Sequence, residues 1–342
     1  MDKKLRVGVI GLGGISGVHI PALMDLPLAE ITAVCDVKED RLRAGMEKTG
    51  AEGYTDYREI LAREDIDIVH ILTPHYLHAP MAIDALRAGK HVLTEKPMAS
   101  TIEDAKAMIR AADESKGTLN VIFQNRYNAS TVELKRIIDS GEAGKFLCAR
   151  ASVCWHRTEP YYTQSGWRGR WATEGGGSLI NQAIHTLDLL SYLGGPIRRV
   201  RGHVSTDTLE GVIEVEDNCH AVFEYESGAT GVLHTTNSYA VDAPILLEMV
   251  FEKAVYQLVA EKLFRIVDGV PELVLKGEDA KELGVKSYWG ASHKYQIARV
   301  YECITNGVPF EIDGRSGFPA LCLVKSIYRS SETGKWVELE KV

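Results

Sequence analysis

Short apolar runs alternate with amphipathic segments over the first 120 residues of the chain. The runs are rich in β-branched residues and nearly free of charge, which is typical of strands buried on both faces of a sheet. The amphipathic segments have helical spacing, and one of them begins at Thr101, a predicted N-cap, and ends near Gly117. This alternation predicts an α/β domain with a doubly wound parallel sheet. The predicted strands are 5–10, 30–35, 67–72, 91–94 and 118–123.

The pattern changes after residue 122. From residue 145 to about residue 275, apolar and polar residues alternate, which predicts antiparallel strands with one solvated face. Ser227-Gly228 predicts a hairpin turn within this region, and helical patterns cover 178–195 and 292–307. We therefore expect a first domain over residues 1–122 and a second, α+β domain over residues 123–342 with an open antiparallel sheet. Because one face of that sheet lacks an evident helical cover, we also expect a homodimer or homotetramer.

Length, charge and cysteine usage limit the classes of function. A chain of 342 residues with 45% hydrophobic and 25% charged residues is long enough to build two hydrophobic cores. The net charge of −8 argues against a nucleic-acid or anionic-membrane surface. No apolar stretch is long enough to span a bilayer, and the glycine-broken run near the start fits a strand and turn better than a signal peptide. The six cysteines are scattered, without a CxxC, so we expect reduced thiols, no metal centre and a cytoplasmic protein.

A glycine-rich turn, GVIGLGGISG at residues 8–17, joins the first predicted strand to the first predicted helix. Gly11 and Gly13 match the first two glycines of G-x-G-x-x-G, and Ser16 replaces the third. Gly11 permits the tight turn, and Gly13 lets the backbone approach a pyrophosphate at the helix N-terminus. Asp36 ends the second strand, where an acid binds the adenosine ribose and repels a 2′-phosphate. The pattern predicts a Rossmann domain that binds NAD, with NADP less favoured.

A lysine stands between a glutamate and a proline in LTEKPMAST, residues 93–101. Lys96 follows the carboxyl end of a predicted parallel strand, where ligands bind in open α/β sheets. Pro97 restricts the backbone there, and a partly buried lysine has a lowered pKa and can act as a general base. The alternative for Lys96 is a solvated surface charge.

Several motifs resemble those of the glucose–fructose oxidoreductase and inositol 2-dehydrogenase family. They are TPHYLHAPMAIDALRAGKHVLTEKPMA (73–99), GGGSLINQAIHTLDLL (175–190), CITNGVP (303–309) and SSETGKWVEL (330–339), so the resemblance spans essentially the whole chain. It implies that Lys96 is catalytic and lies beside the nicotinamide and the substrate hydroxyl, and that the Lys96–Pro97 bond is cis. Glu95 either orients Lys96 or caps a neighbouring segment, and His19 and His78 either border the cofactor or pack at helix ends. The expected cofactor contacts are Gly11, Gly13, Gly14, Ile15, Asp36, Thr73, Pro74, His78, Glu95 and Lys96.

Three polar residues share one face of the helix predicted over 178–195. Asn181, His185 and Asp188 stand at positions i, i+4 and i+7, just after the glycines of 175–177. In the family that the chain resembles, an acid occupies the position of Asn181, and the following histidine shares proton handling with the lysine. The resemblance therefore implies a catalytic or substrate-binding His185, with a core histidine as the alternative. Asn181 can bind a substrate hydroxyl but cannot take a proton, and Asp188 either orients His185 or accepts a structural hydrogen bond.

The stretch WHRTEPYYTQSGWRGRW, residues 155–171, is rich in aromatic residues and arginine. Aromatic faces and guanidinium groups suit sugar rings, hydroxyls and phosphates, whereas a loop packed on the sheet is the alternative. We expect substrate contacts from Tyr162 and Arg168, and from Arg126 in QNRY.

These features together predict an NAD-dependent oxidoreductase. It would oxidise a secondary alcohol of a sugar, polyol or sugar derivative, or catalyse the reverse reduction, with Lys96 and His185 handling the hydroxyl proton. One alternative is a glycosidase that oxidises and re-reduces its sugar with bound NAD. Another is a non-catalytic NAD-binding regulator, against which the retention of both Lys96 and His185 counts.

Overall fold

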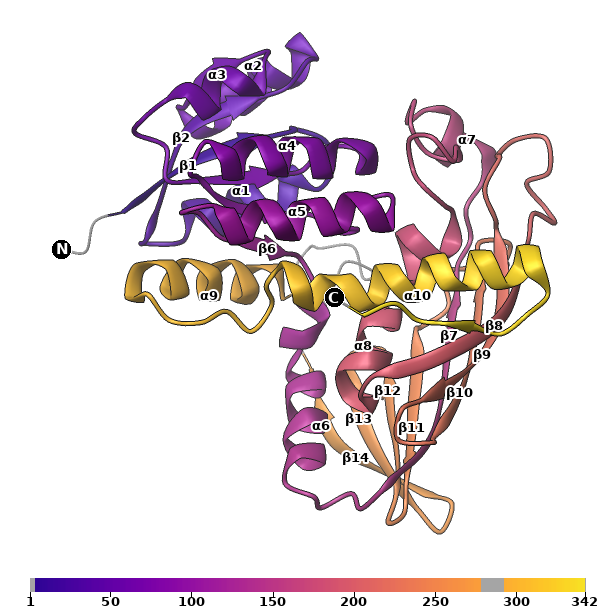
Figure 1. Ribbon diagram of the computed structural model, residues 1–342. Helices are drawn as coiled ribbons and strands as arrows, with labels where there is room; N and C mark the ends of the chain where they lie inside the picture. Colours follow the sequence, from indigo (N-terminus) through magenta and orange to yellow (C-terminus); the bar gives the residue numbers. More distant parts are fainter. Residues whose placement is uncertain (1–3, 278–291, 342) are drawn as a thin grey trace. The chain divides into compact units, whose positions relative to one another are not determined.

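The computed structural model describes residues 4–277 and 292–341, which form two compact units (Figure 1). Unit 1 comprises Met1–Gln124 and Ser292–Phe318, and unit 2 comprises Asn125–Ala291 and Pro319–Val342. The segment from Ser292 to Phe318, which we placed with the second domain, therefore packs with the first. In the described part of the chain, no helix has both the length and the hydrophobicity needed to cross a membrane.

Unit 1 contains a six-stranded parallel sheet with the order β3-β2-β1-β4-β5-β6. The order reverses between β1 and β4, which is the Rossmann arrangement, and ligands bind beyond the carboxyl ends of the strands at this point. The doubly wound sheet predicted from the sequence is confirmed. Its strands are β1 (Leu5–Ile10), β2 (Ala29–Cys35), β3 (Glu52–Tyr54), β4 (Ile68–Ile71), β5 (His91–Thr94) and β6 (Leu119–Val121).

Helices pack on this sheet, and their apolar side chains form a hydrophobic core with those of the strands. Ile20 and Leu23 of α1 share a buried cluster with Val7 and Val9 of β1 and with residues of α9. The predicted N-cap of α5 is confirmed, because the Thr101 side chain accepts a hydrogen bond from the Asp104 N–H. The helices are α1 (Ser16–Met24), α2 (Glu39–Thr49), α3 (Tyr57–Ala62), α4 (His75–Arg87), α5 (Ile102–Glu114) and α9 (His293–Asn306).

A buried glutamine ties α9 to unit 1. The Gln296 side chain accepts a hydrogen bond from the Phe123 N–H at 2.9 Å and donates one to the Val121 carbonyl at 2.7 Å. Ile297, Val300 and Tyr301 add apolar contacts to the same core. These contacts explain why a helix late in the sequence belongs to the first unit.

Unit 2 contains a nine-stranded sheet with the order β14-β13-β12-β11-β7-β10-β9-β8-β15. Most neighbours are antiparallel, as predicted, and the hairpin at Ser227-Gly228 joins β9 to β10. The central pair β7 and β10 is parallel, so the sheet is mixed rather than purely antiparallel. Its strands are β7 (Phe146–Cys154), β8 (Ile197–Ser205), β9 (Asn218–Tyr225), β10 (Thr230–Thr236), β11 (Leu246–Phe251), β12 (Val255–Val259), β13 (Lys262–Val267), β14 (Val270–Lys276) and β15 (Val337–Glu338).

The helix predicted over 178–195 is not regular. Its first part, η2 (Ser178–Ala183), is a π-helix, and only the remainder, α8 (Ile184–Gly194), is α-helical. Because a π-turn changes the angular spacing of side chains, the shared face predicted for Asn181, His185 and Asp188 does not hold as a simple α-helical stripe. The other helices of unit 2 are a 3₁₀ turn η1 (Gln124–Tyr127) at its start, α6 (Ala129–Asp139), α7 (Glu159–Thr163) and most of α10 (Gly314–Thr333).

Apolar side chains lie on an exposed face of the unit 2 sheet. Val222 of β9 and Val232 of β10 are paired across the strands and are 43% and 49% exposed. Leu246 and Val250 of β11, which is separated from β10 by β7, are partly exposed. An exposed apolar surface of this kind favours association with a second copy of the chain.

We predict that this face forms a subunit interface in a dimer or tetramer. Light scattering at micromolar concentration is expected to show the oligomer for the wild type and a smaller species for Val232→Glu. Val241→Glu, at a loop position that is 61% exposed, serves as the control and should leave the mass unchanged. A monomeric wild type would contradict the prediction.

Candidate active site

The glycine turn lies between β1 and α1, as the sequence predicts. Gly11 has a φ of +95°, and a Cβ there would lie 2.8 Å from the backbone carbonyl of Leu72, so this position requires glycine. A Cβ on Gly13 would meet only the Arg41 side chain, at 3.8 Å, and one on Gly14 would meet nothing within 4 Å. The backbone at Gly13 and Gly14 is therefore open to a ligand at the start of α1, which fits a dinucleotide pyrophosphate.

Asp36 stands directly after β2 and beside the glycine turn. Its carboxylate accepts hydrogen bonds from the Leu12 and Lys38 N–H groups, each at 2.8 Å, and the residue is buried. These two bonds fix the carboxylate next to the open glycines. The placement fits the ribose of a dinucleotide, whose hydroxyls would donate to the same oxygens.

We predict that NAD binds at least several-fold more tightly than NADP, because the Asp36 carboxylate repels a 2′-phosphate. Calorimetric titration with both dinucleotides measures the ratio. Asp36→Ala should reduce it, whereas Asp40→Ala at an exposed position of α2 should not. Equal affinities in the wild type would remove Asp36 from this role.

Lys96 follows β5 by two residues, and the Lys96–Pro97 peptide bond is cis, as the resemblance implies. Strand β5 pairs with β4, and β4 pairs with β1. Because the three strands are parallel, Gly11, Thr73 and Lys96 follow their carboxyl ends at one edge of the sheet. Gly11 and Thr73 thus lie at the point where the strand order reverses, and Lys96 follows the next strand along the sheet.

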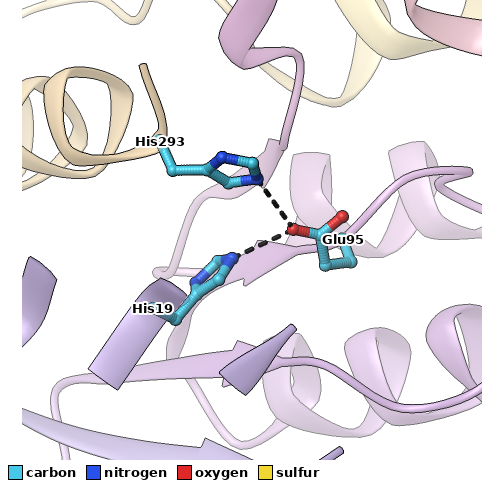
Figure 2. A group of neighbouring side chains, drawn as sticks. All are labelled: His19, Glu95 and His293. Atoms are coloured by element: carbon cyan, nitrogen blue, oxygen red, sulfur yellow. Dashed lines mark hydrogen bonds and ion pairs between the residues drawn. The ribbon is translucent and has the colours of Figure 1, made fainter. Parts of the chain in front are cut away.

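Two histidines hold the Glu95 carboxylate, as Figure 2 shows. His19 Nε2 lies 3.0 Å and His293 Nε2 3.6 Å from the same Glu95 oxygen, and all three side chains are at most 7% exposed. Burial opposes ionisation of Glu95, but the hydrogen bond from His19 and the nearby His293 ring lower its pKa well below the usual range. The other carboxylate oxygen accepts from the Lys96 N–H at 3.2 Å. Glu95 therefore anchors the turn that carries Lys96; its contact with the cofactor remains a prediction.

The histidine network continues into the core of unit 1. His19 Nδ1 lies 3.0 Å from His70 Nδ1, and His70 Nε2 lies 3.0 Å from the Tyr301 hydroxyl. Burial lowers the pKa of His70 and raises that of Tyr301, so both groups are neutral. Because an ionised Glu95 can only accept, His19 Nε2 donates to it, and the tautomers of the two rings set the donor and acceptor roles in the other two contacts.

His19, Glu95 and His293 also offer three ligand atoms that lie within 4.8 Å of one another, as many as a catalytic zinc ion takes from protein. The hydrogen bonds described above account for the same arrangement without an ion. The three residues come from α1, the end of β5 and α9. Because the three residues lie far apart along the chain, no short sequence spacing indicates them as a group.

His78 of α4 joins two of the strand ends. Its ring nitrogens lie 2.7 Å from the Pro97 carbonyl and 2.8 Å from the Thr73 carbonyl, and the residue is buried. Burial lowers the pKa of His78, while the two carbonyl oxygens act against this shift. The ring therefore connects the segment after β4 to the segment after Lys96. Both His78 and His19 have a packing role here, and their contact with the cofactor stays a prediction.

A polar network surrounds Asn181 in unit 2. Its amide nitrogen donates to the Glu174 carboxylate at 2.6 Å and lies 3.4 Å from the Tyr161 hydroxyl. Gln182 donates to the same hydroxyl at 3.1 Å. No sequence motif indicates Glu174 or Tyr161 as a site residue. The one local signal for Glu174 is its position directly before the three glycines.

Tyr162 occupies a different environment from the one expected. Its ring belongs to a buried cluster with Leu209, Ile213 and Val215, and its hydroxyl accepts a hydrogen bond from Asn237 at 2.9 Å. This placement favours a packing role for Tyr162. The neighbouring Tyr161, which contacts both side-chain amides, is the better candidate for a substrate contact.

His185 lies in the first turn of α8 and is 8% exposed. Asp188, one turn on, forms a bidentate ion pair with Arg126, with N–O distances of 2.8 and 2.5 Å. The Arg126 guanidinium also lies over the Tyr192 ring. Asp188 thus accepts structural hydrogen bonds, which is one of the two roles that the sequence allows for it. Arg126 supports α8 through this pair, and its contact with substrate remains a prediction.

Two arginines flank the Tyr161 ring. The Arg157 and Arg168 guanidinium carbons lie 5.3 and 4.5 Å from the ring centroid, and Arg157 also pairs with Asp242. The buried Arg168 Nε has no hydrogen-bond partner among the described residues. A cationic aromatic cluster of this kind can bind an anionic or hydroxyl-rich ligand.

Comparison with known proteins agrees with both halves of this description. Residues 5–123 match the family described as an oxidoreductase family with an NAD-binding Rossmann fold, and residues 131–257 match the GFO/IDH/MocA C-terminal domain. The first match confirms the predicted NAD-binding class of the cofactor site.

Individual relatives span the whole chain. The WlbA dehydrogenase of Bordetella pertussis, solved in complex with NADH and UDP-GlcNAcA, is 31% identical with a TM-score of 0.90 over 100% of this chain and 99% of that one. The myo-inositol 2-dehydrogenase of Thermotoga maritima is 27% identical over 99% of both chains. The levoglucosan dehydrogenase of Pseudarthrobacter phenanthrenivorans is 28% identical over 69% of this chain and 68% of its own. The chain belongs to the GFO/IDH/MocA family of NAD-binding oxidoreductases.

Proposed function

We propose that this protein is an NAD-dependent dehydrogenase that oxidises a secondary alcohol of a sugar, polyol or sugar derivative, or reduces the corresponding ketone. The observation that carries the proposal is the place of Lys96. It follows β5 at the edge of the sheet that also carries the glycine turn and Thr73. A lysine at this edge lies in the region that a dinucleotide bound at the glycine turn would occupy.

The chain supplies proton transfer and position. A nicotinamide held by the glycine turn and Asp36 would supply the acceptor for the hydride of the carbinol carbon. Lys96 takes the hydroxyl proton on its amine, with His185 sharing the proton or holding the hydroxyl. Asn181 cannot take a proton, so its role is to hold a second polar group of the substrate.

The cluster of Tyr161, Arg157 and Arg168 supports a substrate with negative charge. The full-length relative from Bordetella pertussis was solved with a nucleotide sugar of this kind. We therefore propose nucleotide sugars with an acidic sugar as the first class to test, ahead of neutral sugars and polyols.

A screen of nucleotide sugars, sugars and polyols that follows nicotinamide absorbance tests the proposal. Reduction of NAD by one of them, lost in Lys96→Met, is the expected result. Release of a hydrolysed sugar without net NADH would point instead to a glycosidase that uses NAD transiently. NAD binding without any turnover would point to a non-catalytic regulator.

A further inference from the structure

A buried carboxyl group lies behind Asn181. Glu174 is 1% exposed, and its two carboxylate oxygens accept hydrogen bonds from the Asn181 side chain at 2.6 Å and from the Gly169 N–H at 2.5 Å. Both oxygens of this carboxyl group therefore have a donor, and one of these donors is the Asn181 side chain.

The Glu174 contact determines how the Asn181 amide is oriented. An ionised carboxylate can only accept hydrogen bonds, so Asn181 must present its nitrogen and not its oxygen to Glu174. The Tyr161 hydroxyl lies 3.4 Å from the same nitrogen. The Asn181 oxygen, on the other side of the planar amide group, is therefore directed away from Glu174.

Further polar contacts hold this arrangement in place. Tyr161 accepts from Gln182 at 3.1 Å, and Gln182 accepts from Asn237 at 3.1 Å. Asn181 and Gln182 themselves lie in the π-helical segment η2. Segments of π-helix inside helices occur frequently at functional sites.

We propose that Glu174 is a positioning residue that orients Asn181, so that the amide oxygen accepts a hydrogen bond from a substrate hydroxyl. This inference rests on the proposed function, in which Asn181 binds the sugar. A hydroxyl held in this way keeps its proton, which distinguishes it from the hydroxyl that gives its proton to Lys96.

The contact depends on the charge of Glu174. Burial raises its pKa to about 7, while the bonds from Gly169 and Asn181 and the charge of Arg168 act against this shift. The groups that face it electrostatically are Arg168, Glu216, Tyr162 and Tyr328. Below about pH 7 one Glu174 oxygen carries a proton and faces the N–H of Gly169 or Asn181, so the hydrogen bond at that oxygen is weakened. KM for the substrate should therefore rise as the pH falls through about 7.

An exchange of the two side chains tests the proposal. Asn181→Asp alone places two carboxyl groups in contact, so that one must take up a proton. In Glu174→Gln alone, the new amide nitrogen faces either the Asn181 amide nitrogen or the Gly169 N–H. Both are donors, so one hydrogen bond is lost. Each single variant should lower kcat/KM roughly tenfold, as expected for one lost hydrogen bond. In the double variant Glu174→Gln/Asn181→Asp, the new amide at position 174 donates to the new carboxylate at position 181 and still accepts from Gly169. Its kcat/KM should therefore exceed that of both single variants.

Glu216→Gln is the matched control. Glu216 is 2% exposed, and burial raises its pKa to about 7, but its bonds come from Gly177, Leu179 and Tyr328 rather than from Asn181. We expect it to destabilise the protein without rescuing Asn181→Asp. In Glu174→Gln, but not in Glu216→Gln, the rise of KM below pH 7 should disappear.

Multiplicative effects of the two substitutions on kcat/KM would overturn the proposal. The proposal would also be overturned if the double variant recovered the wild-type free energy of unfolding in urea but not the wild-type KM. The contact would then serve folding alone. If the wild type turns over no substrate, calorimetric binding of UDP-GlcNAcA with NADH present replaces KM. Rescue of binding would support the role of Glu174 although the proposed reaction had failed, and absence of binding would overturn both.

Discussion

Lys96→Met is expected to lower kcat by about 10²–10⁴-fold, the usual cost of removing a general base. Methionine has nearly the length of lysine but no amine, so the hydroxyl proton loses its acceptor while the packing of the turn is retained. Asn181 cannot replace the lysine, because an amide does not take a proton. The measurement is kcat on any substrate that passes the screen, together with the calorimetric affinity for NAD.

NAD affinity should change little in this variant, because the glycine turn and Asp36 are untouched. Lys116→Met, at an exposed position of the same unit, is the control and should keep full turnover. A Lys96→Met enzyme that retained more than roughly a tenth of the wild-type kcat would assign proton transfer to another group. Loss of NAD binding in parallel with kcat would indicate a structural role for Lys96 instead.

Asp188→Ala is expected to lower the free energy of unfolding by about 3–5 kcal/mol, because it leaves the buried Arg126 charge without its partner. The two side chains are 12% and 3% exposed, and they are joined by two hydrogen bonds. Burial raises the pKa of Asp188, and the neighbouring Arg126 charge acts against this shift. Urea unfolding of the purified variant gives the value.

Asp139→Ala provides the comparison, because Asp139 pairs with Lys135 on the surface of the same unit. Exposed pairs at this helical spacing contribute about 0.3–0.5 kcal/mol. The double variant Arg126→Met/Asp188→Leu should recover much of the loss, since removing both buried charges also removes their desolvation cost. If Asp188→Ala cost no more than Asp139→Ala, the pair would not be the support of α8 that its geometry indicates.

The sequence by itself determined the type and order of most elements in unit 1. Strands β1 and β5 have the predicted bounds, because a short apolar run between turn residues has few alternatives. The Thr101 cap and the Gly11 turn are local features as well, since each depends on one residue type at one backbone conformation. The Glu95-Lys96-Pro97 motif is likewise a local feature that is read directly from the sequence.

Contacts between distant segments were decided by the tertiary structure. Helix α9 follows the second sheet in the sequence but packs in unit 1, because Gln296 and its apolar neighbours match the core there. The parallel pairing of β7 with β10 is also not readable from alternation, which is the same for either direction.

The candidate site shows the same division. Lys96, Asp36 and His185 could be proposed from motifs, whereas Glu95 and its two histidines come from three separate segments. Glu174 meets Asn181 only because the chain folds back through three glycines into a π-turn, and the sequence of η2 fits a regular α-helix equally well. Local periodicity determines which elements form; the packing of side chains that are distant in sequence decides which residues meet.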